Sequence, residues 1–322
     1  MKKIIITQEN SQQRIDRFLV SAFAKATADK KELFSSGMTR GEIIRNINSG
    51  QVLLNGDPTK PSHMVKKNDE IKIDIKKEDK KLIPNKKVKL EIIYSDKNII
   101  VINKPAGLQV HPVRLEQDTL ANGLLAQFPE IKNITDGSKD SELRPGIVHR
   151  LDKYTSGILI IARNQTTFDE LKKLFQSRKI KKEYLALVFG KLKNKKGVIE
   201  KPLARSQNYK KQIIAGPRTR TKIRPAVTEY EVLEEYANYS MVAARPKTGR
   251  THQIRIHLSA LGHPIVGDDK YKSKKYKSSE KVTRQLLHAK KIRFSLLGKE
   301  YSFQVPLSQD FNLFLAGLTE NS

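Results

Sequence analysis

Near the middle of the chain, residues 146–157 read Gly-Ile-Val-His-Arg-Leu-Asp-Lys-Tyr-Thr-Ser-Gly. The apolar run at residues 158–162 follows directly, and its short, continuous, β-branched character predicts a buried strand. Asp152 therefore lies on a turn that leads into a core strand. A side chain on such a turn is held in place by the rigid element behind it.

Two interpretations of Asp152 are open from the local pattern. The first is a surface turn aspartate that bonds its own backbone. The second is a reactive carboxylate, because His149, Arg150 and Lys153 place positive charge around a single acid. Neighbouring cations hold a carboxylate in its ionised form, and an ionised acid in a closed pocket can act as a nucleophile.

Composition indicates a polyanionic partner. Lys and Arg number 62 against 34 Asp and Glu, a net charge of +28 over 322 residues. A solubilising surface needs a net charge of only about 2–8 for a small domain. The excess favours RNA or DNA over a membrane as the partner, and the length favours two domains.

Other classes are excluded or disfavoured by residue types that are missing. The chain has no cysteine, which excludes disulfides, thiol catalysis and thiolate metal sites. No apolar run approaches the ~20 residues of a membrane span, and the first residues lack the apolar core of a signal peptide. We expect a cytoplasmic protein with no membrane association.

Residues 1–75 predict a small basic αβ module. Apolar residues recur at helical spacing from Ile15 to Phe23, and Thr39 with Glu42 forms a capping box for a second helix that ends at Gly50. The order of elements, with residues 50–56 reading Gly-Gln-Val-Leu-Leu-Asn-Gly, resembles an S4 RNA-binding domain. Residues 25–37 lengthen the link between the two helices beyond the usual S4 pattern. A generic αβ module is the alternative.

The rest of the chain predicts a linker and a larger domain. Residues 76–89 have the Lys-rich composition of a linker. Residues 90–322 show many strands at hairpin-like spacing and few helices, which favours antiparallel or mixed pairing. The expected fold is α+β: an S4-like module, then a domain with a mixed, mostly antiparallel sheet flanked by helices and loops. Thr167 is expected to cap one helix, and residues 251–262 to form another, closed by Gly262.

Positive charge is concentrated after the central strand. Between residues 171 and 224 there are 18 Lys or Arg and two acids, Glu183 and Glu200. Such a bias predicts a face laid along a phosphate backbone. Residues 191–196 fit a solvated loop better.

Several catalytic classes lack their motifs. His252 and His257 are five residues apart on the expected helix, so they do not share a face as metal ligands would, and no metal site is expected. No Walker, dinucleotide-binding or nucleophile-elbow motif occurs. A glycosidase needs two carboxylates, and no second acid lies within several residues of Asp152.

Four motifs occur in order along the chain: Lys-Pro-Ala-Gly-Leu at 104–108, His-Arg-Leu-Asp with Thr-Ser-Gly at 149–157, Lys-Glu-Tyr at 182–184, and the segment from Gly249 to His257 with Gly-His-Pro-Ile-Val-Gly-Asp at 262–268. Together they resemble the RluA-type family of large-subunit rRNA pseudouridine synthases. The similarity runs from the S4-like module to about residue 306.

This resemblance implies isomerisation of uridine to pseudouridine in RNA without a cofactor. Asp152 matches the catalytic aspartate, which either attacks the ribose C1′ or assists departure of the base as a glycal forms. Tyr184 matches the tyrosine that stacks on the base and can take part in removing the C5 proton, and Arg255 matches the arginine paired with the aspartate. The remaining candidates, for contacts with RNA, are Arg150, His149, Lys104, Arg250, His252 and Lys182.

The expected substrate is 23S rRNA, with the helix 69 loop as the best candidate, and the expected oligomeric state is a monomer. Two other functions are open. One is a non-catalytic RNA-binding or ribosome-assembly protein, in which Asp152 would be exposed and unpaired. The other is an RNA N-glycoside hydrolase, which would release uracil. Both enzymatic functions require that the target nucleotide be extruded from its stack before the enzyme can reach it.

Overall fold

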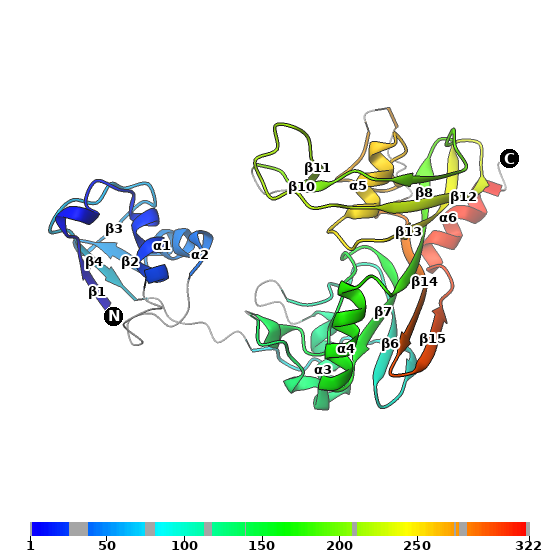
Figure 1. Ribbon diagram of the computed structural model, residues 1–322, viewed down its shortest axis with the longest axis horizontal. Helices are drawn as coiled ribbons and strands as arrows, with labels where there is room; N and C mark the ends of the chain where they lie inside the picture. Colours follow the sequence, from blue (N-terminus) through cyan, green and yellow to red (C-terminus); the bar gives the residue numbers. More distant parts are fainter. Residues whose placement is uncertain are drawn as a thin grey trace. The chain divides into compact units, whose positions relative to one another are not determined.

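The computed structural model describes residues 2–25, 38–74, 81–112, 118–138, 140–207, 211–273, 275–276 and 282–319. The chain divides into two compact units, Met1–Asp79 and Lys80–Ser322 (Figure 1). Most of the expected link between the first two helices, residues 26–37, lies outside the described ranges. None of the described helices is long and apolar enough to cross a membrane.

The first unit is a four-stranded antiparallel sheet with two helices. Its strand order is β1 (Lys2–Ile5), β4 (Glu70–Ile73), β2 (Val52–Leu54) and β3 (Asp57–Pro58). Helix α1 (Ile15–Lys25) and helix α2 (Arg40–Asn48) supply apolar residues to its core. The short helix η1 spans Gln8–Asn10.

Two polar features hold the helices of this unit. The capping box at the start of α2 is present as expected, with the Thr39 side chain accepting from the Glu42 N–H and the Glu42 side chain accepting from the Thr39 N–H. The carboxylate of Asp16 on α1 is fully buried. Arg14 and Arg40 donate to it at 2.7–3.2 Å, so Arg40 ties α2 to α1.

The second unit is built on a nine-stranded sheet. Its order is β5 (Glu91–Ser95), β6 (Ile99–Lys104), β7 (Ser156–Ala162), β14 (Leu287–Leu296), β8 (Lys181–Phe189), β13 (Tyr239–Pro246), β12 (Thr228–Glu235) and β9 (Lys196–Ile199), with β15 (Lys299–Gln304) paired to β14. Among the described strands only β7 and β14 pair in parallel. The prediction of a mixed, mostly antiparallel sheet is confirmed.

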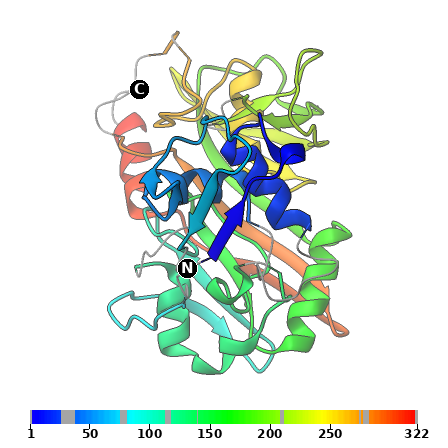
Figure 2. The ribbon, with the colours of Figure 1, turned by 90° about the vertical axis from the view of Figure 1, so that its left-hand side faces the viewer.

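Helices cover both faces of this sheet. Helix α5 (Gln253–Ala260) packs on the face that carries Ala186, Val188 and Val242, whereas α6 (Gln309–Thr319) packs on the face that carries Leu187 and Met241. Helix α4 (Gln165–Gln176) packs against β7, and α3 (Leu120–Gln127) contributes to the same large core. Figures 1 and 2 show α6 (red) lying away from α4 (green). The smaller elements of this unit are β10 (Leu203–Arg205), β11 (Gln212–Ile214), η2 (Pro129–Asn133) and η3 (Ser141–Leu143).

Some boundaries differ from the sequence prediction. The cap of α4 is Asn164, whose side chain accepts from the Thr167 N–H, because Thr167 lies inside the first turn and is buried. Strand β8 begins at Lys181, so Lys182 is a strand residue. Helices α3 and α6 were not predicted. Helix α5 is shorter than residues 251–262 because its cap, His252, has a left-handed backbone.

The second half of the segment predicted as a linker, residues 76–89, packs against the second unit. Leu82 and Leu90 pack against the core of the second unit. Asn122 of α3 donates to the Ile83 carbonyl at 2.8 Å and accepts, through its own carbonyl, from the Asn85 N–H at 3.0 Å. Lysine-rich composition alone does not reveal these apolar and backbone contacts.

One glycine is required where β7 meets β14. Gly157 has φ +110°, and a Cβ at this position would lie 2.3 Å from the Ala289 carbonyl oxygen. Gly157 and Ala289 are partners in the parallel pairing. Since the obstructing atoms belong to backbone, a side chain here must separate the two strands.

We predict that Gly157→Ala destabilises the second unit by about 2–4 kcal/mol, through the positive φ and the overlap with Ala289. Gly298→Ala is the matched control, because Gly298 also has a positive φ (+77°) but has open space around it. The control should lose only about 1 kcal/mol. Urea unfolding followed by circular dichroism measures both, and equal losses in the two variants would refute the packing argument.

Candidate active site

Asp152 occupies the first position of a tight turn whose backbone carbonyls accept hydrogen bonds from Lys104 and Arg284. The Thr155 N–H donates to the Asp152 carbonyl at 3.1 Å and closes the turn. The Lys153 carbonyl accepts from Lys104 Nζ at 3.0 Å and from the Gly107 N–H at 2.9 Å. The Tyr154 carbonyl accepts from Arg284 Nη1 at 3.1 Å. Both central peptide carbonyls of the turn are therefore fixed.

The carboxylate of Asp152 pairs with Arg255 of α5. Arg255 Nη1 donates to Asp152 Oδ2 at 3.1 Å, while its Nε and Nη2 form two bonds with Asp268 at 2.7 and 2.9 Å. The side chains of Arg255 and Asp268 are 6% and 1% exposed, against 21% for Asp152. Burial alone would lower the pKa of Arg255, but Asp268 and Asp152 outweigh it and raise that pKa. The guanidinium is thus permanently charged.

Asp268 is saturated with donors, and Asp152 is not. Asp268 Oδ1 accepts the backbone N–H groups of Lys270 and Tyr271 at 3.0 Å each, in addition to Arg255. Within the described part of the chain, Asp152 Oδ1 has no hydrogen-bond partner, so this oxygen is available for chemistry. Asp268 therefore holds Arg255 in place, and Arg255 positions Asp152.

His252 and Tyr271 complete the surroundings of Asp152. His252 Nε2 lies 3.8 Å from Asp152 Oδ2, and His252 Nδ1 lies 2.7 Å from the Tyr271 hydroxyl. Burial lowers the pKa of His252; Asp152 opposes this shift, and Arg255 and Lys270 add to it. The Tyr271 hydroxyl accepts from the Gln212 N–H, so its hydrogen is free to donate to Nδ1. This pattern favours the neutral imidazole with its N–H directed at Asp152.

Tyr184 lies on the site face of β8. Alternate residues of a strand share a face, and Tyr184 follows the parity of Ala186 and Val188, which pack against α5. Burial, with the negative charge of Asp152 as the second cause, raises the pKa of Tyr184 above its usual range. The phenol therefore stays protonated at neutral pH.

Two of the residues expected to contact RNA are turned inward. Lys104 is fully buried and donates to three carbonyls, those of Pro105, Leu108 and Lys153. Burial lowers the pKa of Lys104 to about 7, with Arg284 adding to the shift and Asp152 opposing it. A buried ammonium with three internal acceptors favours a positioning role over the RNA contact expected from sequence.

His149 is the second inward-facing residue. Its Nε2 accepts from the Ile160 N–H at 2.9 Å, and its ring stacks on Phe175 at 4.6 Å. Burial, with the charge of Lys182 as a smaller cause, lowers the pKa of His149 to about 3. The neutral ring accepts a hydrogen bond from the backbone of β7 and so connects the segment before Asp152 to that strand. This contact also favours a positioning role for His149.

Besides His252, three candidates remain, and all three are at least partly exposed. Arg150 is exposed, and its Nη1 lies 3.2 Å from His111 Nε2. Arg250 donates from Nε to the Pro225 carbonyl at 3.1 Å. Lys182 is half-buried, has its Nζ 5.7 Å from the Phe175 ring centre, and makes no ion pair within the described residues. Burial lowers its pKa, and no neighbouring acid opposes that shift.

Three residues around Asp152 were not identified from the sequence. Asp268 is the last residue of the Gly262–Asp268 motif, and its place in that motif could have identified it as a site residue. Tyr271 and Arg284 lie in segments without a motif, and only the fold brings them to the site. Arg284 also forms a bidentate pair with Asp310, which fixes it beneath the turn.

Comparison with known proteins agrees with this geometry. The family model for RNA pseudouridylate synthase matches residues 98–260, which contain β6 to α5 and therefore Asp152, Tyr184 and Arg255. An uncharacterized RNA pseudouridine synthase of Chlorobaculum parvum is 34% identical over 96% of this chain and 95% of its own length. Ribosomal large subunit pseudouridine synthase D of Borreliella burgdorferi is 36% identical over 84% of each chain.

A solved structure extends the similarity to the fold. Human RNA Pseudouridylate Synthase Domain Containing 1 superposes with a TM-score of 0.57 at 27% identity, over 73% of this chain and 97% of its own. The chain belongs to the RNA pseudouridine synthase family. Within it, the similarity to large-subunit synthases places the chain in the RluA type, as isomerases of uridine in RNA.

We predict that Asp268→Asn lowers the free energy of unfolding by about 3–5 kcal/mol, because it removes one partner of a buried ion pair. Pseudouridine formation should fall at least tenfold, since Arg255 then loses the group that orients it toward Asp152. Glu130→Gln is the control: it removes one charge from the Arg163 pair, whose side chains are 33% and 43% exposed. Such pairs contribute about 0–1 kcal/mol. Urea unfolding and a pseudouridine assay give both values, and a loss in Asp268→Asn no larger than in the control would contradict the assignment.

Proposed function

We propose that this enzyme converts a uridine of 23S rRNA, in the loop of helix 69, into pseudouridine, with Asp152 as the reactive carboxylate. The observation that carries the proposal is the Asp152 carboxyl group on a fixed turn, with Oδ2 bonded to Arg255 and with no hydrogen-bond partner for Oδ1 among the described residues. The names of the large-subunit relatives support the ribosomal target. The net charge of +28 supports an RNA partner.

The reaction is an isomerisation, so atoms balance without a cofactor. The C1′–N1 bond breaks, the uracil turns, and a C1′–C5 bond forms; N1 gains a proton and C5 loses one. Asp152 either adds to C1′ or assists formation of a glycal. In both routes the carboxyl group of Asp152 acts next to C1′, and the permanently charged guanidinium of Arg255 holds it there through Nη1.

Tyr184 and Lys182 are proposed to contact the extruded nucleotide. An aromatic ring on the site face offers a stacking surface for the base, and the protonated phenol of Tyr184 suits proton traffic at C5. Lys182 lies on the same face of β8, two residues away. A half-buried cation without a carboxylate partner is well placed to bind a phosphate of the target strand. Arg150 and Arg250 are proposed to contact further phosphates of the RNA. His252 is proposed to contact the RNA next to Asp152.

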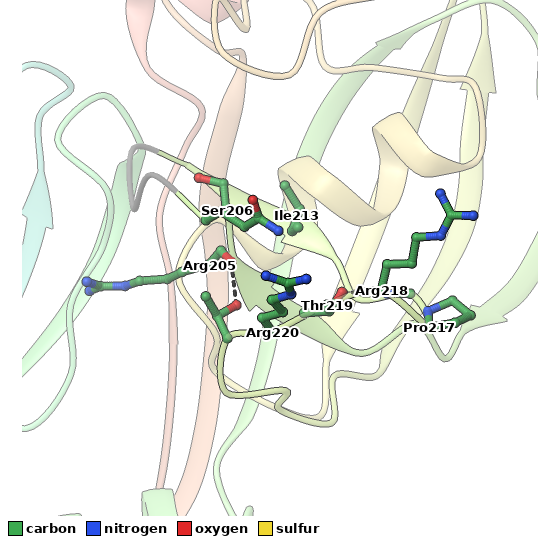
Figure 3. Close-up of a pocket in the computed structure, with 10 residues that line it drawn as sticks. Arg205, Ser206, Ile213, Pro217, Arg218, Thr219 and Arg220 are labelled. Atoms are coloured by element: carbon green, nitrogen blue, oxygen red, sulfur yellow. Dashed lines mark hydrogen bonds between the residues drawn. The ribbon is translucent and has the colours of Figure 1, made fainter.

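The segment from Lys201 to Arg224 is proposed as the main RNA-binding surface of the second unit. It contains β10 and β11 and no acidic residue. The exposed cations among its described residues are Lys201, Arg205, Lys211, Arg218, Arg220, Lys222 and Arg224. A hollow of about 660 Å³ lies among them, and Figure 3 shows the guanidinium groups of Arg205, Arg218 and Arg220 spread apart from one another.

Residues of this basic segment contact Tyr271, which lies beside Asp152 in the candidate active site. Ile214 packs against the apolar cluster that contains Tyr271, and the Gln212 N–H donates to the Tyr271 hydroxyl. Tyr271 in turn contacts His252 by a hydrogen bond and Arg255 by a cation–π contact at 5.1 Å. RNA bound along the segment would therefore meet the group of residues that surrounds Asp152.

The first unit is proposed to bind RNA as an S4 domain. Its order of two helices and a strand with the Asn55-Gly56 turn supports this assignment, with Asn55 at φ 53° as the turn demands. We propose that the enzyme acts as a cytoplasmic monomer.

The proposal is tested in a strain that lacks the gene, by mapping pseudouridines in its large-subunit rRNA. We expect a pseudouridine in the helix 69 loop to be lost, restored by the wild-type chain, and not restored by Asp152→Asn. Asp140→Asn is the matched control: it makes the same change at an exposed residue with φ 60°, which asparagine tolerates. Purified Asp152→Asn should bind the rRNA with a wild-type Kd. Loss at another position would overturn the helix 69 assignment, and free uracil would indicate a hydrolase.

The basic segment is tested by the salt dependence of RNA binding. The double variant Arg218→Gln/Arg220→Gln should reduce the slope of log K against log salt by about 1–2, because each lost phosphate contact removes about 0.7–0.9. Lys191→Gln/Lys193→Gln is the control, since these exposed lysines lie in the loop expected to be solvated. An unchanged slope in the arginine variant, or an equal change in both, would refute the proposal.

A further inference from the structure

Tyr154 is a large aromatic side chain exposed on the catalytic turn. Its side chain belongs to the few large apolar or aromatic groups that remain open to solvent, at 47% exposure. It stands two residues after Asp152 within the turn closed by the Thr155 N–H. Two Cα steps of 3.8 Å place its Cα within about 7.6 Å of that of Asp152. Packing of the core does not account for an aromatic ring here, because the ring lies outside every core cluster of the described residues.

The backbone beneath this ring is unusually well fixed. The Tyr154 carbonyl accepts from Arg284, which is 6% exposed and is itself held by Asp310. The preceding carbonyl, of Lys153, accepts from the buried Lys104 and from the Gly107 N–H. Because the backbone beneath the ring is already fixed, binding of a ligand to the ring orders no further backbone at this position.

A cation lies next to the ring. Lys153 Nζ is 5.5 Å from the centre of the Tyr154 ring and makes no ion pair within the described residues. An aromatic face beside a free cation matches the chemistry of a nucleotide, which offers a base to stack and a phosphate to pair. Neither group is needed to position Asp152, because Arg255, Lys104 and Arg284 already do that.

We propose that Tyr154 is a stacking subsite for the nucleobase of a nucleotide adjacent to the target uridine, with Lys153 contacting the phosphate between them. The proposal rests on the proposed catalytic role of Asp152, since that role places the target beside the turn. Stacked nucleotides follow one another at about 3.4 Å, so a ring anchored within about 7.6 Å of the reactive residue is within one or two nucleotide steps. The stacking accepts any base, because every base has an aromatic face.

The test is a binding cycle between the protein and an RNA that lacks one base. The probes are RNA hairpins of about 20 nucleotides centred on a uridine that the wild-type enzyme modifies, intact or with an abasic nucleotide at the 5′ or the 3′ neighbour. Kd is measured in the Asp152→Asn background so that no turnover occurs. Tyr154→Leu should weaken binding of the intact hairpin about 5- to 50-fold. With one of the two abasic hairpins, the same substitution should change Kd less than twofold.

Two further variants separate stacking from other effects. Tyr154→Phe keeps the ring and should remain within twofold of the parent on every hairpin. Leu313→Ala removes an exposed apolar side chain on α6 and should also remain within twofold. The proposal is overturned if Tyr154→Leu binds the intact hairpin as well as the parent, or weakens the intact and both abasic hairpins equally. The rRNA target is decided separately by mapping, because the hairpin is taken from whichever RNA the enzyme modifies.

Discussion

The site depends on one guanidinium that is shared by two carboxylates. Arg255 is separated from Asp268 by 13 residues and from Asp152 by 103, and it bonds both. A buried arginine paired with a single carboxylate would have no donor directed at a second acid. Because Asp268 takes two of its donors and is satisfied by backbone N–H groups as well, the third donor is aimed at Asp152. Asp152 is therefore oriented through Oδ2, while its Oδ1 has no hydrogen-bond partner among the described residues.

Sequence reasoning identified the residues that we propose to react but not those that hold them. Asp152, Tyr184 and Arg255 lie in motifs, and the structure pairs Asp152 with Arg255 and couples its charge to Tyr184. Lys104 and His149 belong to motifs too, yet sequence does not reveal whether a cation faces RNA or backbone carbonyls. Arg284 has no local signature, because its role exists only once β14 lies next to β7.

The same distinction applies to the fold. Apolar periodicity and hairpin spacing predicted most strands and the antiparallel character of the sheet, because these features are local. The parallel pairing of β7 with β14, the helix α6, and the packing of residues 82–90 on α3 depend on contacts between distant segments. The cap of α4 was misplaced by three residues because Thr167 and Asn164 are both good capping residues, and only burial of Thr167 distinguishes them.

The junction of β7 and β14 has a consequence for the timing of activity during protein synthesis. Ser156 and His288, which pair across this junction, are 132 residues apart, and the arginine that supports the turn arrives with the later segment. Closing so large a loop is slow relative to local hairpins. The first unit and Asp152 are therefore synthesised long before Arg284, which supports the Asp152 turn. With the RNA-binding role that we propose for the first unit, a nascent chain would associate with RNA before the turn that carries Asp152 is complete, and would become active only when nearly all of the polypeptide has emerged.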